Sequence, residues 1–188
     1  MRLDTPRVQP LPEDQWSDEV REILAGVQVG GRGRPANIFT TLARHPKLLR
    51  RWLVFGNHVL FKSTLPVRER ELAILRVGWL CRSAYEFGQH TVIGRQAGLD
   101  DGEIQRVTLG PEAPGWSTDD ATLLRAVDEL HADSFVSDAT WSALARRWSV
   151  AQVLDLLFAV GQYRLVSGVL NSLGVQLDAG VPGFPDDE

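Results

Sequence analysis

The stretch that decides the fold covers residues 71–90 and reads ELAILRVGWLCRSAYEFGQH. Its first half carries apolar residues at spacings of three and four, among them Leu72, Leu75 and Trp79, and this spacing predicts a helix. Ser83 follows, and serine favours the position just before the first turn of a helix. We therefore expect two consecutive helices with a short turn between them.

The same helical spacing recurs on both sides of this stretch, and no segment alternates with the period of two that strands show. Serine, aspartate and proline precede or open most of the periodic segments, as is typical of helix starts. The expected helices cover residues 37–43, 46–61, 83–98, 117–131, 137–148 and 150–173. Another helix should follow a Thr64 cap and include Leu72 to Leu80, and shorter helices should begin near Asp18 and Asp100. The sequence predicts an all-α fold, a single-domain bundle of about eight helices.

The length of 188 residues suits one domain with a substantial core. Residues 1–16 contain three prolines and no periodic pattern, so we expect an extended N-terminal arm. The helical domain should cover residues 17–177, and the glycine-rich segment 30–35 should be its most flexible part. Residues 178–188 combine glycine, proline and acidic residues, which predicts an acidic flexible tail.

Composition excludes several classes of function. A net charge of −4 gives no broad attraction to nucleic acid or to an anionic membrane. No apolar run approaches the roughly 18 residues of a membrane span, and the N-terminus does not resemble a signal peptide. The single cysteine, Cys81, excludes an intrachain disulfide. We expect a cytoplasmic protein.

The segment 150–173 is apolar on almost all sides. A helix of this kind is either buried centrally or packed against another subunit. We therefore expect a homo-oligomer, whether dimer, trimer or hexamer.

Three ionisable residues in the deciding stretch point to chemistry. Glu86 and His90 are four residues apart, which places them on one face of a helix. Glu71 lies among apolar residues, and burial there would raise the pKa of its carboxyl group toward neutrality. An imidazole beside two carboxyl groups is equipped to move protons near neutral pH.

Structural explanations compete with this one. Ser83 and Glu86 have the spacing of a capping box, in which each side chain binds the other residue's backbone N–H. His90 and Glu86 would form a surface ion pair if they face solvent. A metal site with Glu71 as third ligand is a weaker interpretation, because no further histidine has a suitable spacing. The start of the second helix is also a ready anion site.

The motif formed by Glu71, Ser83, Glu86 and His90 resembles that of the carboxymuconolactone decarboxylase family, which includes the alkylhydroperoxidase D-like proteins. The family pattern is E-x11-C-x2-C-x3-H, and here Ser83 and Glu86 stand at the two cysteine positions. Further similarity is found at residues 35–49, 65–77 and 130–177, so the resemblance spans residues 35–177, about three quarters of the chain. The resemblance implies the helical fold of that family.

The two substitutions in the motif argue against one family activity. In the peroxide-reducing members, the two cysteines form a thiol–disulfide couple, and neither serine nor glutamate can replace a thiolate. Cys81 lies two positions before Ser83, so it occupies neither cysteine position of the motif. Its apolar neighbour Leu80 indicates a packed, structural thiol. A hydroperoxidase that works through Cys81 remains the first alternative.

The decarboxylase branch needs no cysteine and no cofactor. Its reaction, as the resemblance implies, removes carbon dioxide from a small carboxylated lactone, with Glu71, Glu86 and His90 as the catalytic residues. The substrate would need cations and polar groups around it. The candidates for substrate binding are Ser83, Tyr85, Arg76 and Arg34. A non-catalytic ligand-binding or assembly protein on the same scaffold is the second alternative.

Overall fold

The computed structural model describes residues 2–27 and 34–185, and within these ranges it contains only helices and connecting segments. The all-α prediction is confirmed. Nine α-helices are present in the described ranges: α1 (Asp18–Ala25), α2 (Asn37–Leu42), α3 (Pro46–Phe61), α4 (Val67–Leu80), α5 (Ala84–Gln96), α6 (Asp101–Leu109), α7 (Thr118–Asp133), α8 (Asp138–Arg147) and α9 (Val150–Leu173). Most of the glycine-rich segment, residues 30–33, lies outside the described residues.

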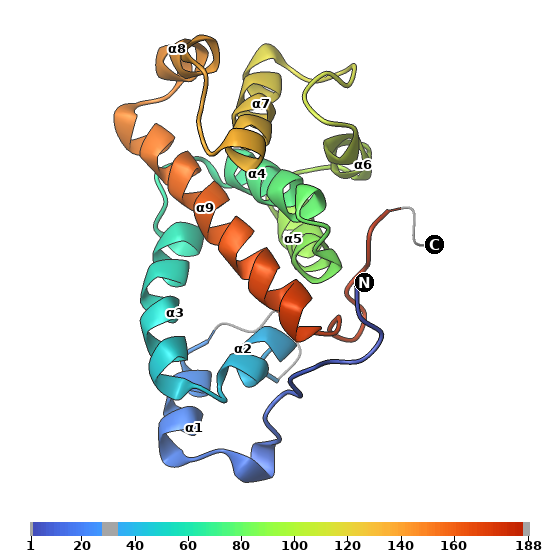
Figure 1. Cartoon of the computed structure of the whole chain (residues 1–188). Coiled ribbons are helices and arrows are strands. Elements are labelled where there is room, and N and C mark those ends of the chain that lie inside the picture. The colour runs from blue at the N-terminus through green and yellow to red at the C-terminus, as the bar shows by residue number, and fades with distance from the viewer. Residues whose placement is uncertain (1, 28–33, 186–188) are drawn as a thin grey trace.

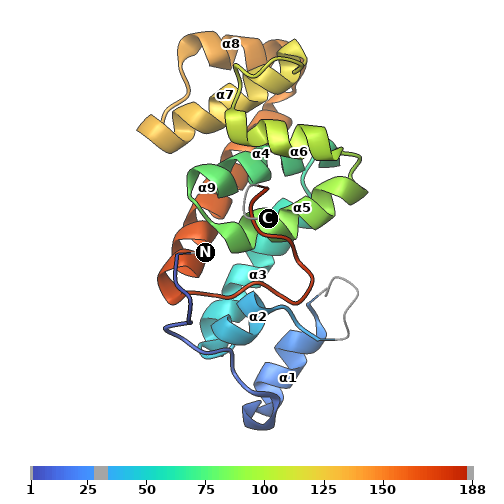
Figure 2. The ribbon, with the colours of Figure 1, turned by 90° about the vertical axis from the view of Figure 1, so that its right-hand side faces the viewer.

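Helix α4 is the centre of the molecule. It packs against α5, α6, α7 and α9, and Figures 1 and 2 show α1 and α2 at one end, α6 to α8 at the other, and α4, α5 and α9 between them. Every residue from Arg70 to Gly78 is buried. This helix therefore carries both the core and, as shown below, two of the ionisable groups of the candidate site.

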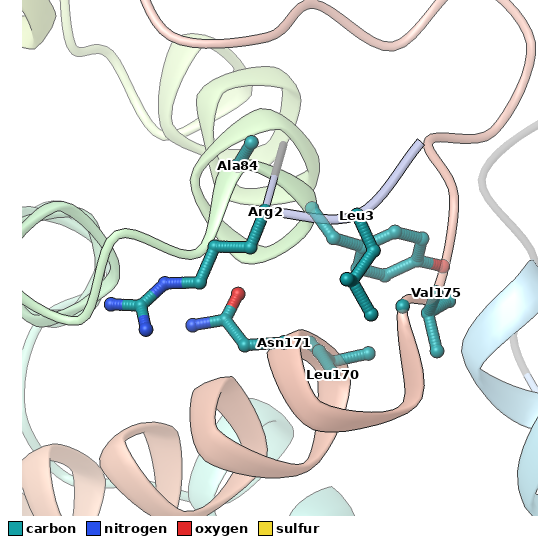
Figure 3. A pocket seen from close by; sticks show the side chains of 8 residues that line it. Arg2, Leu3, Ala84, Leu170, Asn171 and Val175 are labelled. Carbon is teal, nitrogen blue, oxygen red and sulfur yellow. The ribbon is translucent and has the colours of Figure 1, made fainter. Parts of the chain in front are cut away.

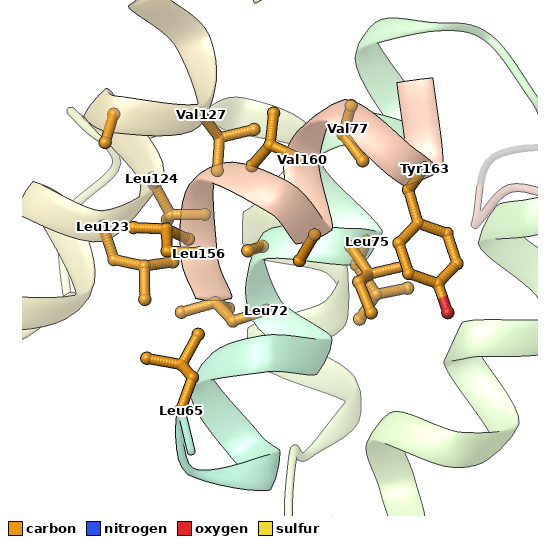
Figure 4. Packing of buried hydrophobic residues seen from close by; sticks show 14 of the residues in the cluster. Leu65, Leu72, Leu75, Val77, Leu123, Leu124, Val127, Leu156, Val160 and Tyr163 are labelled. Carbon is orange, nitrogen blue, oxygen red and sulfur yellow. The ribbon is translucent and has the colours of Figure 1, made fainter. Parts of the chain in front are cut away.

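The main core gathers around the apolar residues of α4. Leu72 and Leu75 are completely buried and meet Leu123 and Leu124 of α7 and Leu156 of α9 within one cluster (Figure 4). Shortening a fully buried leucine to alanine costs about 2–5 kcal/mol of stability, because it removes apolar contacts and leaves a cavity. The central position of α4 therefore rests on packing rather than on local helix propensity.

Most helix starts follow the expected chemistry. The side chains of Ser17, Asp100, Ser117, Ser137 and Ser149 each accept a hydrogen bond from a backbone N–H in the first turn of their helix. Such caps stabilise a helix by about 1 kcal/mol.

Thr64 was expected to cap a helix, and this prediction is wrong. Pro66 is the residue that precedes α4, and Thr64 instead binds Asp155 of α9 through its backbone N–H and its hydroxyl group, at 2.5 and 2.7 Å. The hydroxyl therefore holds the segment before α4 against α9 rather than closing the first turn of its own helix.

Helix α9 is long and apolar enough to cross a membrane if length and composition alone are considered. Half of its most apolar window is buried inside the protein. It runs in front of α4 and α5 in the view of Figure 1 and beside α3. Its other face is exposed.

The expected flexible tail, residues 178–188, stays a prediction: residues 186–188 lie outside the described ranges, and residues 178–185 make specific contacts. The carboxylate of Asp178 accepts hydrogen bonds from the Tyr85 hydroxyl, the Gln89 amide and the backbone N–H of Asn37, at 2.7, 2.6 and 3.0 Å. Phe184 packs edge to face on the rings of Trp79 and Phe87 in the core cluster. Asp178 and Phe184 therefore hold residues 178–185 against the helices, which the acidic composition of this segment does not predict.

Candidate active site

The turn between α4 and α5 places the candidate site. Arg82 adopts a left-handed backbone conformation (φ 51°), and the chain then enters α5 at Ser83. Gly78 has no side chain, and a Cβ there would lie 3.4 Å from the backbone nitrogen of Phe87, so α4 and α5 approach closely. This packing brings the middle of α4 beside the middle of α5.

Three predicted residues converge there. The Nδ1 atom of His90 lies 2.5 Å from Oε2 of Glu71, and its Nε2 atom lies 3.1 Å from Oε1 of Glu86. The side chains of Glu71, His90 and Glu86 are only 0%, 5% and 6% exposed. Both ring nitrogens of the imidazole thus face carboxyl groups inside the protein, which rules out the surface ion pair.

Two further residues belong to this cluster, and the sequence analysis missed both. Arg70 donates two hydrogen bonds to Oε1 of Glu71, at 3.1 and 3.0 Å, and its side chain is 7% exposed. The ring of Tyr163, from α9, packs edge to face on the imidazole of His90 at 4.7 Å between centroids. The run of charges before Glu71 could have indicated a buried arginine, but nothing in the sequence connects Tyr163 with His90.

The electrostatics favour a protonated imidazole. Burial alone lowers the pKa of His90, but the carboxyl groups of Glu71 and Glu86 outweigh this effect and raise the pKa to about 9. Burial likewise raises the pKa of Glu71, yet His90 and Arg70 together bring it below its ordinary value. At neutral pH the site therefore holds an imidazolium and an ionised Glu71, with a guanidinium on the other oxygen of that carboxylate.

The hydroxyl group of Tyr163 has no hydrogen bond to any residue in the described ranges. Burial and the nearby carboxyl groups of Glu86 and Glu71 raise its pKa well above the ordinary value. The phenol therefore stays neutral and keeps a donor and an acceptor available beside His90.

Two cavities among the described residues lie apart from this cluster. A small cavity of about 10 Å³, room for roughly one water molecule, lies between the N-terminal arm, the start of α5 and the end of α9 (Figure 3). A shallow hollow of about 550 Å³ lies over the outer face of α3. Neither is lined by Glu71, Glu86 or His90.

Ser83 does not form the capping box with Glu86, and that interpretation is wrong. Its side chain caps no backbone N–H, and Glu86 binds His90 instead. The hydroxyl of Ser83 is fully buried and has no hydrogen-bond partner among the residues that the structure describes. A buried hydroxyl group without a hydrogen-bond partner costs folding free energy. Ser83 lies on the same face of α5 as Glu86 and His90.

Tyr85 lies on the other side of α5. Its hydroxyl donates to Asp178 and accepts from the backbone N–H of Ile38, at 2.7 and 3.2 Å. The side chain thus holds the C-terminal segment and α2 to α5, and its role in substrate binding stays a prediction without geometric support.

The two arginines proposed to hold a carboxylate are placed elsewhere. Arg76 is buried and makes a two-pronged ion pair with Asp128 at 2.6 and 2.8 Å, while its third nitrogen donates to the carbonyl oxygens of Val107 and Thr108. All of its donor groups already have partners inside the protein, so Arg76 is a structural connection between α4, α6 and α7. Arg34 is exposed, and no contact links it with the cluster.

Cys81 is half-buried and poorly suited to react with peroxide. Burial raises the pKa of its thiol, against smaller opposing effects of nearby cations, and a protonated thiol is a weak nucleophile. Its sulfur lies 3.8 Å from Nδ1 of His131, not beside His90. Across the described ranges, no group of three or more His, Cys, Asp or Glu residues is arranged to hold a metal ion.

Comparison with known proteins adds the family. The model of the carboxymuconolactone decarboxylase family matches residues 46–129. This segment contains α3 to α6, most of α7, and the Glu71, Glu86 and His90 cluster. The match covers 84 of the 188 residues, and it is to the same family that the motif resembles. The segment match agrees with the family predicted from the motif, and in this chain Ser83 and Glu86 stand at the two cysteine positions of that motif.

Solved structures agree in fold. An uncharacterized peroxidase-related protein with an alkylhydroperoxidase AhpD core, from Ralstonia eutropha JMP134, superposes with a TM-score of 0.80, at 20% identity over 92% of each chain. A peroxidase-related protein from Silicibacter sp. TM1040 gives 0.77 at 18% identity, over 96% of this chain and 93% of that one.

A third structure comes from a protein named for different chemistry. It is the debrominase Bmp8, solved as a cysteine-to-alanine variant with 2,3,4-tribromopyrrole, and it gives a TM-score of 0.77 at 11% identity over 94% of each chain. At these identities the likeness establishes the fold and no activity. A comparison with curated proteins gives no match.

Proposed function

We propose that this protein is a cofactor-independent lyase that transfers a proton through Glu71, His90 and Glu86 while it decarboxylates a small carboxylated lactone or carbonyl compound. The observation that carries the proposal is an imidazole with both nitrogens bound to carboxyl groups in a buried site. The name of the family, after a decarboxylase, supports the class of reaction.

The chemistry requires a proton donor. Loss of carbon dioxide breaks a carbon–carbon bond and leaves the electron pair on carbon as an enolate-like anion, which must then accept a proton. An imidazolium with a pKa of about 9 is protonated at neutral pH and can donate. The neutral imidazole then recovers a proton from water, so the overall reaction consumes one proton and one carboxylate and releases carbon dioxide.

The two carboxyl groups have different roles in this proposal. Glu71 binds Nδ1 at the shorter distance and is itself held by Arg70, so it fixes the orientation of the ring. Glu86 binds Nε2 at the longer distance from one turn away on the same helix. Rotation of Glu86 would free the Nε2 proton for substrate, with the Tyr163 hydroxyl nearby to bind an oxygen of the developing enolate.

The experiment is a screen of lactones and β-keto acids for release of carbon dioxide. His90→Gln keeps the size of the side chain but removes the proton donor, and it should lower kcat by about 100-fold or more. His131→Gln, at a partly buried histidine outside the cluster, is the matched control and should change kcat less than twofold. Equal rates in wild type and His90→Gln would refute the proposal.

A second candidate, a non-catalytic role for the cluster, is favoured by its burial. His90 is 4% exposed, and neither described cavity is lined by the three residues. On this account, the whole panel gives no turnover and His90→Gln only lowers the free energy of unfolding. The hydroperoxidase alternative is disfavoured, because Ser83 and Glu86 replace the thiols and the Cys81 thiol has a raised pKa.

A further inference from the structure

Helix α9 has an exposed, mostly apolar face along one side. Six exposed residues form this face, which we call the α9 seam: Leu154, Phe158, Gly161, Leu165, Gly168 and Ser172. The side chains of Leu154, Phe158 and Leu165 are 47%, 58% and 58% exposed. Soluble proteins rarely leave such large side chains side by side in water unless another surface covers them.

The spacing of the seam is that of a helix-pairing face. Its six positions are separated by four, three, four, three and four residues. This is the heptad repeat, in which every first and fourth position faces a second helix. Neither glycine of the seam has an atom of its own chain within 4 Å of an added Cβ, so the space above both is open.

The large and small side chains of the seam are complementary to those of a second, antiparallel α9 seam. If a second α9 lies antiparallel across a two-fold axis beside residue 163, then Leu154 faces Ser172, Phe158 faces Gly168, and Leu165 faces Gly161. Every large residue then meets a small one, and each pair joins the two core positions of the heptad, as antiparallel pairing requires. We propose that the α9 seam pairs with the α9 seam of a second copy of this chain in this register.

Charge allows the same seam to meet itself. The 24 residues of α9 include only two charged ones, Asp155 and Arg164. Asp155 is bound to Thr64, and the guanidinium of Arg164 donates to the Leu130 carbonyl and Ser134 hydroxyl, at 3.2 and 3.4 Å. Because both charges are held against their own chain, two identical seams can approach without placing like charges face to face.

The neighbouring helix supplies the rest of the area. A helix of 24 residues is about 36 Å long and 10 Å wide, which is less than half of the roughly 800 Å² per partner in a standard interface. Helix α3 adds exposed Val54 and Phe55, and the Phe55 ring meets Phe158 edge to face at 6.0 Å. The hollow of about 550 Å³ lies on this same part of α3.

The seam lies directly behind the candidate site. Tyr163 is at the level of the predicted two-fold axis but on the inner face of α9, where its ring packs on His90. Association would therefore stiffen the helix that holds this ring against the imidazole. The pairing itself does not depend on the reaction proposed above.

The test measures the mass of the full chain in solution by sedimentation equilibrium over a dilution series. The wild type should have an even multiple of the 20.9 kDa chain mass. Leu165→Glu and Gly161→Gln should each raise the dissociation constant at least tenfold, while helix content by circular dichroism stays unchanged. Leu109→Glu is the matched control, because Leu109 is 69% exposed on α6, away from the seam, and it should have no effect.

The register has its own test. Gly161→Lys and Leu165→Glu in one chain place opposite charges across the antiparallel pair, so the double variant should associate at least tenfold more tightly than either single variant. An absence of this rescue overturns the antiparallel register.

Four other results overturn the pairing itself. They are a monomeric wild type at micromolar concentration, a trimer, an assembly that both single seam variants leave intact, and a monomer that instead binds neutral phosphatidylcholine vesicles.

Discussion

Raising the pH should destabilise the fold through one buried histidine. The pKa of His90 rises from 6.5, its ordinary value, to about 9 in the folded protein. A group with a raised folded pKa contributes stability that is complete below the unfolded pKa and is lost as pH rises through the folded pKa. The difference corresponds to roughly 3 kcal/mol of free energy of unfolding, lost between about pH 6.5 and pH 9.

The assay is urea unfolding followed by tryptophan fluorescence at several pH values between 6 and 10. The His90→Gln variant is the control, because tyrosine and cysteine groups titrate equally in both proteins and cancel in the difference. The gap in free energy of unfolding between wild type and variant should shrink by about 3 kcal/mol across this range. A gap that stays constant from pH 6 to pH 10 would refute the assigned charge of the imidazole.

Three further perturbations test the surroundings of the site. Gly88→Ala would place a Cβ 2.1 Å from the carbonyl oxygen of Pro182; it should displace the C-terminal segment, lower the free energy of unfolding by about 1–3 kcal/mol and speed proteolysis there. Arg76→Ala removes the buried partner of Asp128 and should cost about 3 kcal/mol in urea unfolding; an unchanged midpoint would contradict this. Cys81→Ser should leave any peroxide consumption unchanged, and the wild-type thiol should react slowly with iodoacetamide at pH 7 because its pKa is raised.

Local sequence patterns predicted the helices well and the cluster in part. Glu86 and His90 share one helix face by spacing alone, and this placement needs only the geometry of α5. The contact of Glu71 with His90 requires α4 to pack against α5, and the spacing of the family motif indicated this packing. The structure shows how that happens, since Gly78 leaves room for the backbone of Phe87.

Contacts between distant segments could not be predicted in this way. Tyr163 is 73 positions after His90 in the sequence, and only the packing of α9 on α5 joins their rings. The tail looked disordered because its composition is acidic, whereas Asp178 finds three donors on α2 and α5. Ser83 matched a capping box, but the carboxyl group that would complete it is bound to an imidazole.

The central claim is that two carboxyl groups keep the buried imidazole of His90 protonated at neutral pH. The most direct measurement is the titration of the four histidine rings by NMR, with His90→Gln used to assign the signal. The account predicts that His90 is protonated at pH 7 and loses its proton with a midpoint near pH 9. A midpoint near 6.5, the ordinary value for histidine, would contradict it.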